Sequence, residues 1–249
     1  MAINVNTVYQ TVLLILNKEQ RGYMTPTEFN SIGTQVQLEV FEKYFEDMNQ
    51  QIRVPQTDTD YADRVENIDE KIAIFKTFGV VNYINTGNLT YFNLPTIDSY
   101  GSGVNFYRLG TVLYNDIEVQ RVDRTDFYHI DKSLLTKPTE TFPVYLYENN
   151  KLFVKPITII NNVKVDYIRK PNDVIWGFNV GTLGQYLYNS NLFNSANEST
   201  GSVDFELHSS EQTELILKIL IYAGIVIRDP NIIQAAAQQV ANDEANKKS

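Results

Sequence analysis

The spacing of apolar residues in the first third of the chain predicts helices. Residues 5–20 carry apolar side chains three and four positions apart, as on one face of a helix. A second helix is expected after Thr25-Pro26-Thr27-Glu28, where Thr25 can cap the helix and Glu28 completes a capping box. Asp58-Thr59-Asp60 suits the start of a third helix, because acidic side chains stabilise the positive end of the helix dipole.

After Gly79 the pattern changes to short β-branched and aromatic segments separated by turn residues, which predicts an antiparallel β-domain over residues 79–171. The clearest hairpin joins Val144–Tyr147 to Lys151–Lys155 through Glu-Asn-Asn. Asparagine tolerates the left-handed backbone angles that such turns require. A further strand is expected over Val163–Arg169, ending before Pro171.

Residues 172–203 are rich in glycine, asparagine and serine. Long loops are uncommon inside compact domains and usually carry contacts. The segment also contains several aromatic residues, which a disordered linker rarely does. We therefore interpret this segment as an interaction arm that becomes ordered against a partner. The candidate contact residues are Trp176, Phe178, Tyr186, Tyr188 and Phe193.

The helical pattern returns at Ser209, which is predicted to cap a helix with Gln212 in the reciprocal position. Asp229-Pro230 is expected to begin a last helix. The predicted fold class is therefore α+β. Residues 1–78 and 204–249 would build one helical body, with the antiparallel β-domain inserted between them. The helix residues expected to be buried are Phe29, Val36, Val40, Tyr44, Ile68, Ile72, Leu215 and Ile219.

Composition narrows the classes of function. The 249 residues suit one elaborated domain, and 43% of them are hydrophobic, which is enough for a packed core. The absence of cysteine excludes disulfides, thiol catalysis and thiolate metal sites. A formal charge of −9 disfavours binding to nucleic acid phosphates. The start of the chain lacks a basic signal region and the apolar runs are too short to cross a bilayer, so we expect no membrane association and synthesis in the cytoplasm.

Candidate chemistry is sparse. His129 and His208 lie far apart in sequence, and no nucleophile-elbow or phosphate-loop motif is present. Asp58, Asp60 and Asp63 resemble part of a calcium loop, but a helix start explains them equally well. We therefore predict a protein that is not an enzyme, with no catalytic, cofactor-binding or metal-binding residue.

Two alternative sites stay open. Asp204 and Glu206 alternate along the chain and could form the carboxylate pair of a glycosidase, although such alternation is commoner on a solvated strand. The aromatic segments Val104–Tyr107 and Tyr145–Phe153 could bind sugars, although packing between strands explains them as well.

Several segments of the chain resemble structural proteins of crAss-like and related podovirus-type tailed bacteriophages. They are Tyr9–Val12, the run from Asn17 to Asn30, Phe41–Phe45, the strand that ends in Tyr-Ile-Arg-Lys-Pro at Pro171, and the segment Asp204–Glu211. Together they cover most of the chain. The resemblance is to proteins of the head-to-tail connector, and it transfers no catalytic residue.

That resemblance implies a ring or adaptor protein beneath the portal, forming part of the DNA channel and a platform for tail assembly. The expected partners are other copies of the chain, in a ring of about twelve, the portal protein, and adjacent ring or tail proteins. DNA would pass through the acidic lumen without specific binding. The expected location is the virion neck, after assembly in the host cytoplasm. The alternatives are another tail component, such as a hub or fibre-attachment protein, a carbohydrate-binding β-domain protein, or a hydrolase with an unrecognised site.

Overall fold

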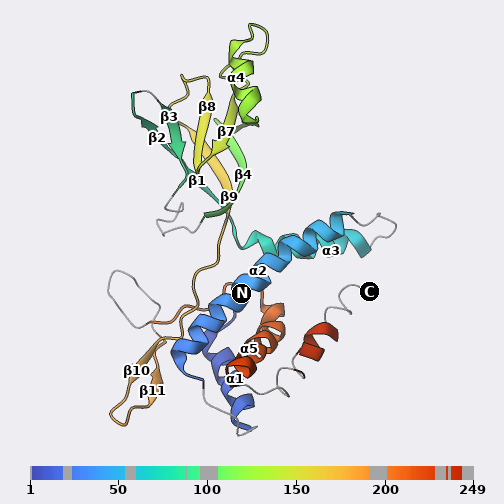
Figure 1. Ribbon diagram of the computed structural model, residues 1–249, viewed down its shortest axis with the longest axis vertical. Helices are drawn as coiled ribbons and strands as arrows, with labels where there is room; N and C mark the ends of the chain where they lie inside the picture. Colours follow the sequence, from blue (N-terminus) through green and yellow to red (C-terminus); the bar gives the residue numbers. More distant parts are fainter. Residues whose placement is uncertain are drawn as a thin grey trace. The chain divides into compact units, whose positions relative to one another are not determined.

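The computed structural model in Figure 1 describes residues 2–18, 24–53, 60–87, 89–95, 106–190, 201–227, 234 and 237–242. The fold class is α+β, with helices and mainly antiparallel sheets. The chain divides into two compact units. One consists of Met1–Ile74 with Pro171–Ser249, and the other is Phe75–Lys170.

The first unit is built mainly from helices. It contains α1 (Val5–Lys18), α2 (Pro26–Arg53), α3 (Asp60–Ala73) and α5 (Gln212–Ile227), with the short 3-10 turn η2 (Ser209–Glu211) directly before α5. Helix α2 packs against α3 and α5, and α1 packs against α5. Extended segments are joined to this unit by isolated bridges between Ile3 and Phe205 and between Ile175 and Val203.

The buried faces of these helices follow the apolar pattern of the sequence. All the core residues that we predicted are buried except Ile68, which is half-buried. The capping box is also confirmed: the Thr25 amide donates to Glu28 Oε2 at 2.9 Å, and the Glu28 amide donates to Thr25 Oγ1 at 3.3 Å.

The start of α5 differs from the prediction. The cap is the side chain of His208, whose Nδ1 accepts a hydrogen bond from the Ser210 amide at 3.3 Å. The 3-10 turn takes up the positions expected for the first helical residues, so α5 begins at Gln212. The expected start of the last helix at Asp229-Pro230 lies outside the described residues; residues 237–242 are helical.

The second unit contains two sheets. One has the strand order β1 (Lys76–Val80), β9 (Val163–Arg169), β4 (Phe106–Tyr114), β5 (Ile117–Glu118). The other has the order β2 (Asn82–Asn85), β3 (Thr90–Asn93), β8 (Lys151–Lys155), β7 (Val144–Glu148), β6 (Gln120–Arg121). Among these strands only β6 and β7 pair in parallel.

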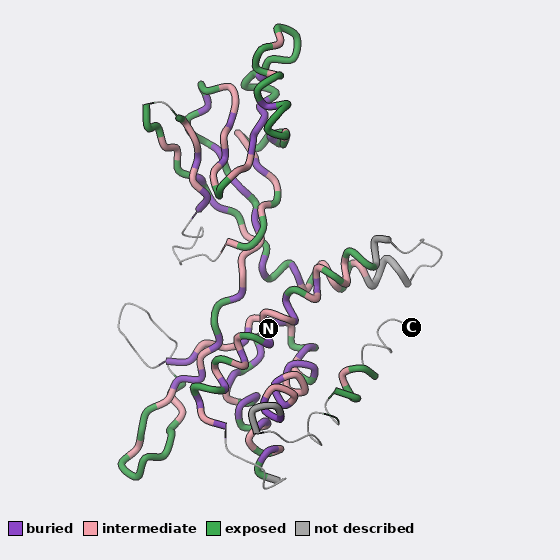
Figure 2. The backbone as a smooth tube through the Cα atoms, in the orientation of Figure 1, coloured by how far each residue is buried: buried purple, intermediate pink, exposed green. Residues whose placement is uncertain are grey.

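One buried cluster joins the two sheets, drawing Val112 and Val165 from the first and Phe92 and Leu152 from the second. In Figure 2 the strands of this unit carry the buried positions, and its loops are mostly exposed. Helix α4 (Arg124–Lys132) lies beside β7, where Phe127 packs with residues of that strand.

The turn chemistry of the β7–β8 hairpin is confirmed. Asn149 and Asn150 both have positive φ, 50° and 56°, in the two-residue turn that joins the strands. The reading of Gly79 as the end of the helical region is wrong by a few residues, because Gly79 lies inside β1. A Cβ on Gly79 would lie 3.0 Å from the side chain of Pro95, so glycine here permits a close approach between segments.

The chain enters and leaves this unit at neighbouring residues. The Arg169 amide donates to the Phe75 carbonyl at 3.0 Å, just beyond the pairing of β1 with β9. The Arg169 guanidinium also lies over the Phe75 ring, 5.7 Å from its centroid. The unit is therefore an insertion whose two ends meet.

Candidate functional site

The segment predicted as an interaction arm forms a hairpin on the helical unit, with strands β10 (Phe178–Val180) and β11 (Tyr186–Tyr188). Figure 1 shows this hairpin extending away from α1, α2 and α5. Phe178 pairs with Tyr188, and Val180 pairs with Tyr186. Directly opposed residues of an antiparallel ladder share a face, so these four side chains lie on one face of the hairpin.

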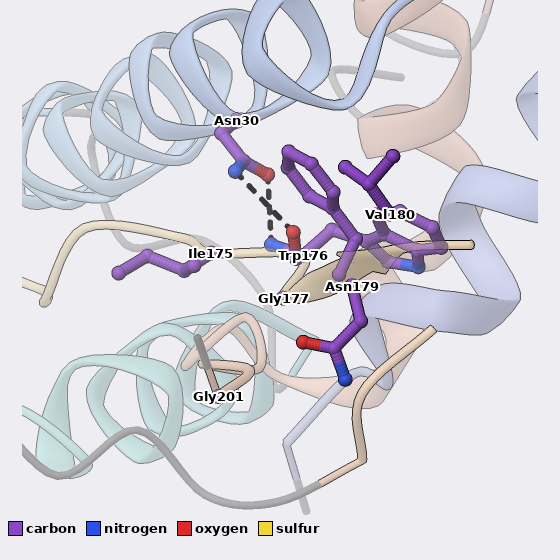
Figure 3. Close-up of a pocket in the computed structure, with 8 residues that line it drawn as sticks. Asn30, Ile175, Trp176, Gly177, Asn179, Val180 and Gly201 are labelled. Atoms are coloured by element: carbon purple, nitrogen blue, oxygen red, sulfur yellow. Dashed lines mark hydrogen bonds between the residues drawn. The ribbon is translucent and has the colours of Figure 1, made fainter. Parts of the chain in front are cut away.

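Trp176 fixes the base of the hairpin to the helices. Its side chain is only 4% exposed, and its indole N–H donates to Asn6 Oδ1 at 3.1 Å. Its backbone amide donates to Asn30 Oδ1 at 2.7 Å, a bond drawn in Figure 3. The Tyr9 ring lies 4.5 Å from the Trp176 ring. The hairpin therefore grows from a residue held by both α1 and α2.

A series of ring contacts connects this buried base to the exposed end. The Trp176 ring stacks on Phe178 and on Tyr188, with centroids 6.0 and 5.6 Å apart. Phe178 then contacts Tyr186 edge-on at 4.9 Å. Aromatic pairs of this kind stabilise by about 0.5–1.5 kcal/mol beyond their buried area. They hold the hairpin in one orientation while its outer part stays in solvent.

The turn of the hairpin is held by hydrogen bonds. The Gly181 amide donates to the Gln185 carbonyl at 2.8 Å, and the Leu183 amide donates to Gln185 Oε1 at 3.1 Å. Gly184 has φ +78°, which favours glycine. The result is a defined turn that presents Leu183 with 90% of its surface exposed.

The outer hairpin concentrates exposed apolar side chains. Val180, Leu183, Tyr186 and Leu187 are all exposed. Elsewhere among the described residues of the helical unit, the only other large hydrophobic side chains as exposed as these are Leu14 and Ile74. A grouped apolar patch on an otherwise polar surface marks an interaction site more often than scattered single residues do.

A hollow of about 400 Å³ lies beside the base of the hairpin. Figure 3 draws the residues that line it, which are Asn30, Ile175, Trp176, Gly177, Phe178, Asn179, Val180 and Gly201. None of them has a titratable side chain, and the Asn30 side chain is bonded to the Trp176 backbone. The hollow can hold an apolar group but offers no acid, base or nucleophile.

The predicted contact residues differ in how exposed they are. Trp176 is buried in its own unit, so its side chain is not presented to a partner. Phe178 and Tyr188 are half-buried, Tyr186 is exposed, and Phe193 lies outside the described residues. Sequence reasoning missed Val180, Leu183 and Leu187. The alternation around Gly181 and Gly184 was the available signal for a hairpin, but the density of glycine and asparagine favoured a loop.

The other polar candidates have structural partners. Asp204 Oδ1 accepts the Val5 amide at 2.8 Å at the start of α1. Glu206 accepts the Asn172 amide at 3.0 Å and its side-chain nitrogen at 3.1 Å. These carboxylates hold extended segments rather than facing each other across a substrate. The side chains of Asp58, Asp60 and Asp63 lie outside the described residues, and no group of three possible metal ligands occurs among those described.

A buried polar cluster between α2, α3 and α5 was not foreseen. Glu211 is 3% exposed and pairs with Lys71, while buried Glu214 pairs with Lys43 at 3.0 Å. The hydroxyl of Tyr44 is buried near both carboxylates and has no hydrogen-bond partner among the described residues. Burial first, and then the charges of Glu211 and Glu214, raise the pKa of Tyr44 far above its usual range. Tyr44 therefore stays neutral, and the carboxylates are neutralised by lysines.

Comparison with known protein families finds no family model that matches the chain, and no curated protein sequence matches it. No helix in the described part of the chain is both long and apolar enough to span a membrane.

Proposed function

We propose that this protein is a non-enzymatic structural subunit of a ring in the head-to-tail connector of a tailed bacteriophage. The observation that carries the proposal is the β10–β11 hairpin, an anchored projection whose outer side chains are apolar and exposed. A subunit held between identical neighbours and other rings needs such preformed contact surfaces. The resemblance of the chain to connector proteins gives the particular assembly.

The distribution of charge supports passage of DNA without binding. One hollow on α2 is lined by Glu39, Glu42, Glu46, Asp47 and Gln50, with Lys43 and Lys218. A lumen surface of this composition repels phosphates, so a DNA strand meets no adhesive contact as it slides past. In the proposed ring, this part of α2 faces the channel.

A sugar-binding role has less support. Sugars stack on the open face of an aromatic ring, but Trp176 is covered by Tyr9, Phe178 and Tyr188. In the β-unit, Tyr145 belongs to the buried cluster. The rings that are accessible there, such as Tyr107 and Tyr128, lie on different elements, β4 and α4.

The test is the mass of the purified protein alone and after mixing with the portal protein of the same phage. We expect particles of many copies, formed by the protein alone or when portal is added, and a ring in electron micrographs. A protein that stays monomeric both alone and with portal would contradict the connector proposal. A ring that forms but does not bind portal would favour another tail component.

A further inference from the structure

The two strands of the β10–β11 hairpin form a sheet of their own, so each has one edge with no partner strand in the described part of the chain. At the two ends of the ladder the Gly181 amide donates to the Gln185 carbonyl and the Asn189 amide donates to the Gly177 carbonyl. These two bonds show which residue pairs of the ladder are hydrogen-bonded. In an antiparallel ladder, bonded and non-bonded pairs alternate, and the residues of a non-bonded pair point their N–H and C=O groups away from the partner strand. The N–H and C=O groups of Phe178 and Val180 therefore point away from β11.

The sequence of the hairpin lacks the residue types that usually protect a strand edge. Proteins guard an exposed strand edge with charged side chains, proline, a bulge or a covering segment, because an open edge pairs with other strands. Residues 174–197 contain no Asp, Glu, Lys, Arg, His or Pro. A two-stranded hairpin is also only marginally stable in water, so an added strand would stabilise it.

The partner that these edges fit is a second copy of the chain. Each copy carries a net charge of −9, so copies repel each other unless they meet at an uncharged surface. The hairpin is such a surface. Each copy also brings both kinds of edge, one on β10 and one on β11, so a head-to-tail row of copies satisfies both edges of every hairpin.

We propose that β10 of one copy pairs antiparallel with β11 of the next, so that the hairpins form a continuous sheet between subunits. Val180, Tyr186 and Leu187, exposed in the single chain, become covered by the neighbouring hairpin. This contact rests on the proposed ring and specifies which surface joins its subunits. The main-chain hydrogen bonds supply the pairing, and the apolar side chains supply the burial.

The first test removes one outward-pointing N–H group. Val180→Pro deletes this donor, which faces solvent in the single hairpin, and proline is tolerated at such edge positions. Val180→Thr keeps both the donor and the branched side chain. We expect Val180→Pro to weaken assembly by about tenfold or more and Val180→Thr to change it little. Trp176 fluorescence checks that the base of the hairpin is unchanged. Equal assembly of the two variants overturns the inference.

The second test uses the absence of cysteine in the chain. Val180→Cys and Tyr186→Cys are prepared separately. Each variant alone, and a mixture of the two that has been allowed to assemble, is then treated with a short bis-maleimide. We expect linked dimers chiefly from the mixture. Dimers from Val180→Cys alone would mean symmetric β10–β10 pairing and overturn the head-to-tail contact. Rings without any link would overturn the hairpin contact and leave the connector proposal standing. Linked dimers from the mixture without rings would support the hairpin contact and contradict the connector proposal.

Discussion

Glu211 and Glu214 illustrate how single buried residues stabilise the helical unit. Each is buried close to where α5 begins, and each has a lysine from another helix, Lys71 or Lys43. Taking a carboxylate out of water is costly unless a partner compensates for its charge. The lysines supply that compensation: Lys43 ties α2 to α5, and Lys71 ties α3 to the turn η2 that precedes α5.

Removal of Lys43 tests this role. In Lys43→Met the side chain keeps much of its length but loses its charge, so Glu214 loses its 3.0 Å ion pair, while the Lys218 Nζ stays 3.8 Å away. We expect the free energy of unfolding of the helical unit to fall by about 1–3 kcal/mol. A urea titration followed by the fluorescence of Trp176, the single tryptophan, reports on this unit alone.

Glu42→Gln is the matched control, because Glu42 lies next in sequence on α2 and is exposed. This substitution should change the free energy of unfolding by no more than about 0.5 kcal/mol. Coincident urea midpoints for Lys43→Met and Glu42→Gln would show that the buried pair adds nothing measurable.

At this scale the sequence predicts burial of apolar residues well, because their spacing on a helix is itself the signal. It did not predict the buried glutamates. In Ser-Ser-Glu-Gln-Thr-Glu the acidic residues suit an exposed first turn. They are removed from water by contacts between distant parts of the chain: α2 packs against α5, and Lys71 of α3 pairs with Glu211.

At the scale of elements, the start of α2 shows how a local motif sets a boundary. Thr25 and Glu28 exchange hydrogen bonds, and Thr25 Oγ1 also donates to Glu28 Oε2 at 2.7 Å. These bonds, to the Thr25 side chain first and then to its backbone, hold the pKa of Glu28 below its ordinary value. The ionised form is therefore favoured in the folded helix.

Thr25→Ala should lower the free energy of unfolding of the helical unit by about 0.5–2 kcal/mol at neutral pH, because the Glu28 amide loses its acceptor, Thr25 Oγ1. Ser31→Ala, further along α2, should cost little, since alanine has the higher helix propensity. The difference between these two variants in urea titrations measures the cap. Equal stabilities at pH 7 would contradict a role for Thr25.

The pH dependence of the cap follows from the direction of the Glu28 shift. A carboxyl group with a lowered pKa in the folded state adds stability above its ordinary pKa, and that contribution is lost as the pH falls through the lowered value. The gap between the parent protein and Thr25→Ala should therefore narrow in acid. A gap that stays constant from pH 7 to well below the ordinary glutamate pKa would argue against this linkage.

Elements with local chemistry were the predictable ones. The capping box and the two-asparagine turn both depend on residues close in sequence, and both are confirmed. The β10–β11 hairpin was missed because its glycines suggested a loop, whereas its order comes from stacking on Trp176. Gly79 suggested a break because its close approach to Pro95 cannot be read from neighbouring residues.

At the scale of the whole molecule, the β-unit has its own core. The buried cluster that joins its two sheets consists entirely of residues between Val81 and Val165. Its first and last strands, β1 and β9, pair with each other. The change of apolar period near Gly79 marks where this kind of structure begins in the sequence, but the pairing of β1 with β9 joins segments too distant for a local pattern to predict.

We expect the fragment Phe75–Lys170 to fold in isolation. A far-UV circular dichroism spectrum typical of β-structure, with a cooperative thermal transition, would agree with a self-contained core. A control fragment of residues 82–177 has the same length but lacks β1, leaving an edge of β9 unpaired, and should lose the transition. Absence of a transition in both fragments would mean that the β-unit depends on the rest of the chain.

The meeting of Phe75 and Arg169 has a consequence for how such chains diversify. An inserted unit whose ends are joined by a hydrogen bond places almost no geometric demand on the residues that flank it. Over evolutionary time, recombination could exchange this β-unit for another of different specificity, or delete it in favour of a short turn, while the helices and the β10–β11 hairpin stay the same. Related genes would then share the two ends of the sequence and diverge abruptly between positions 75 and 170.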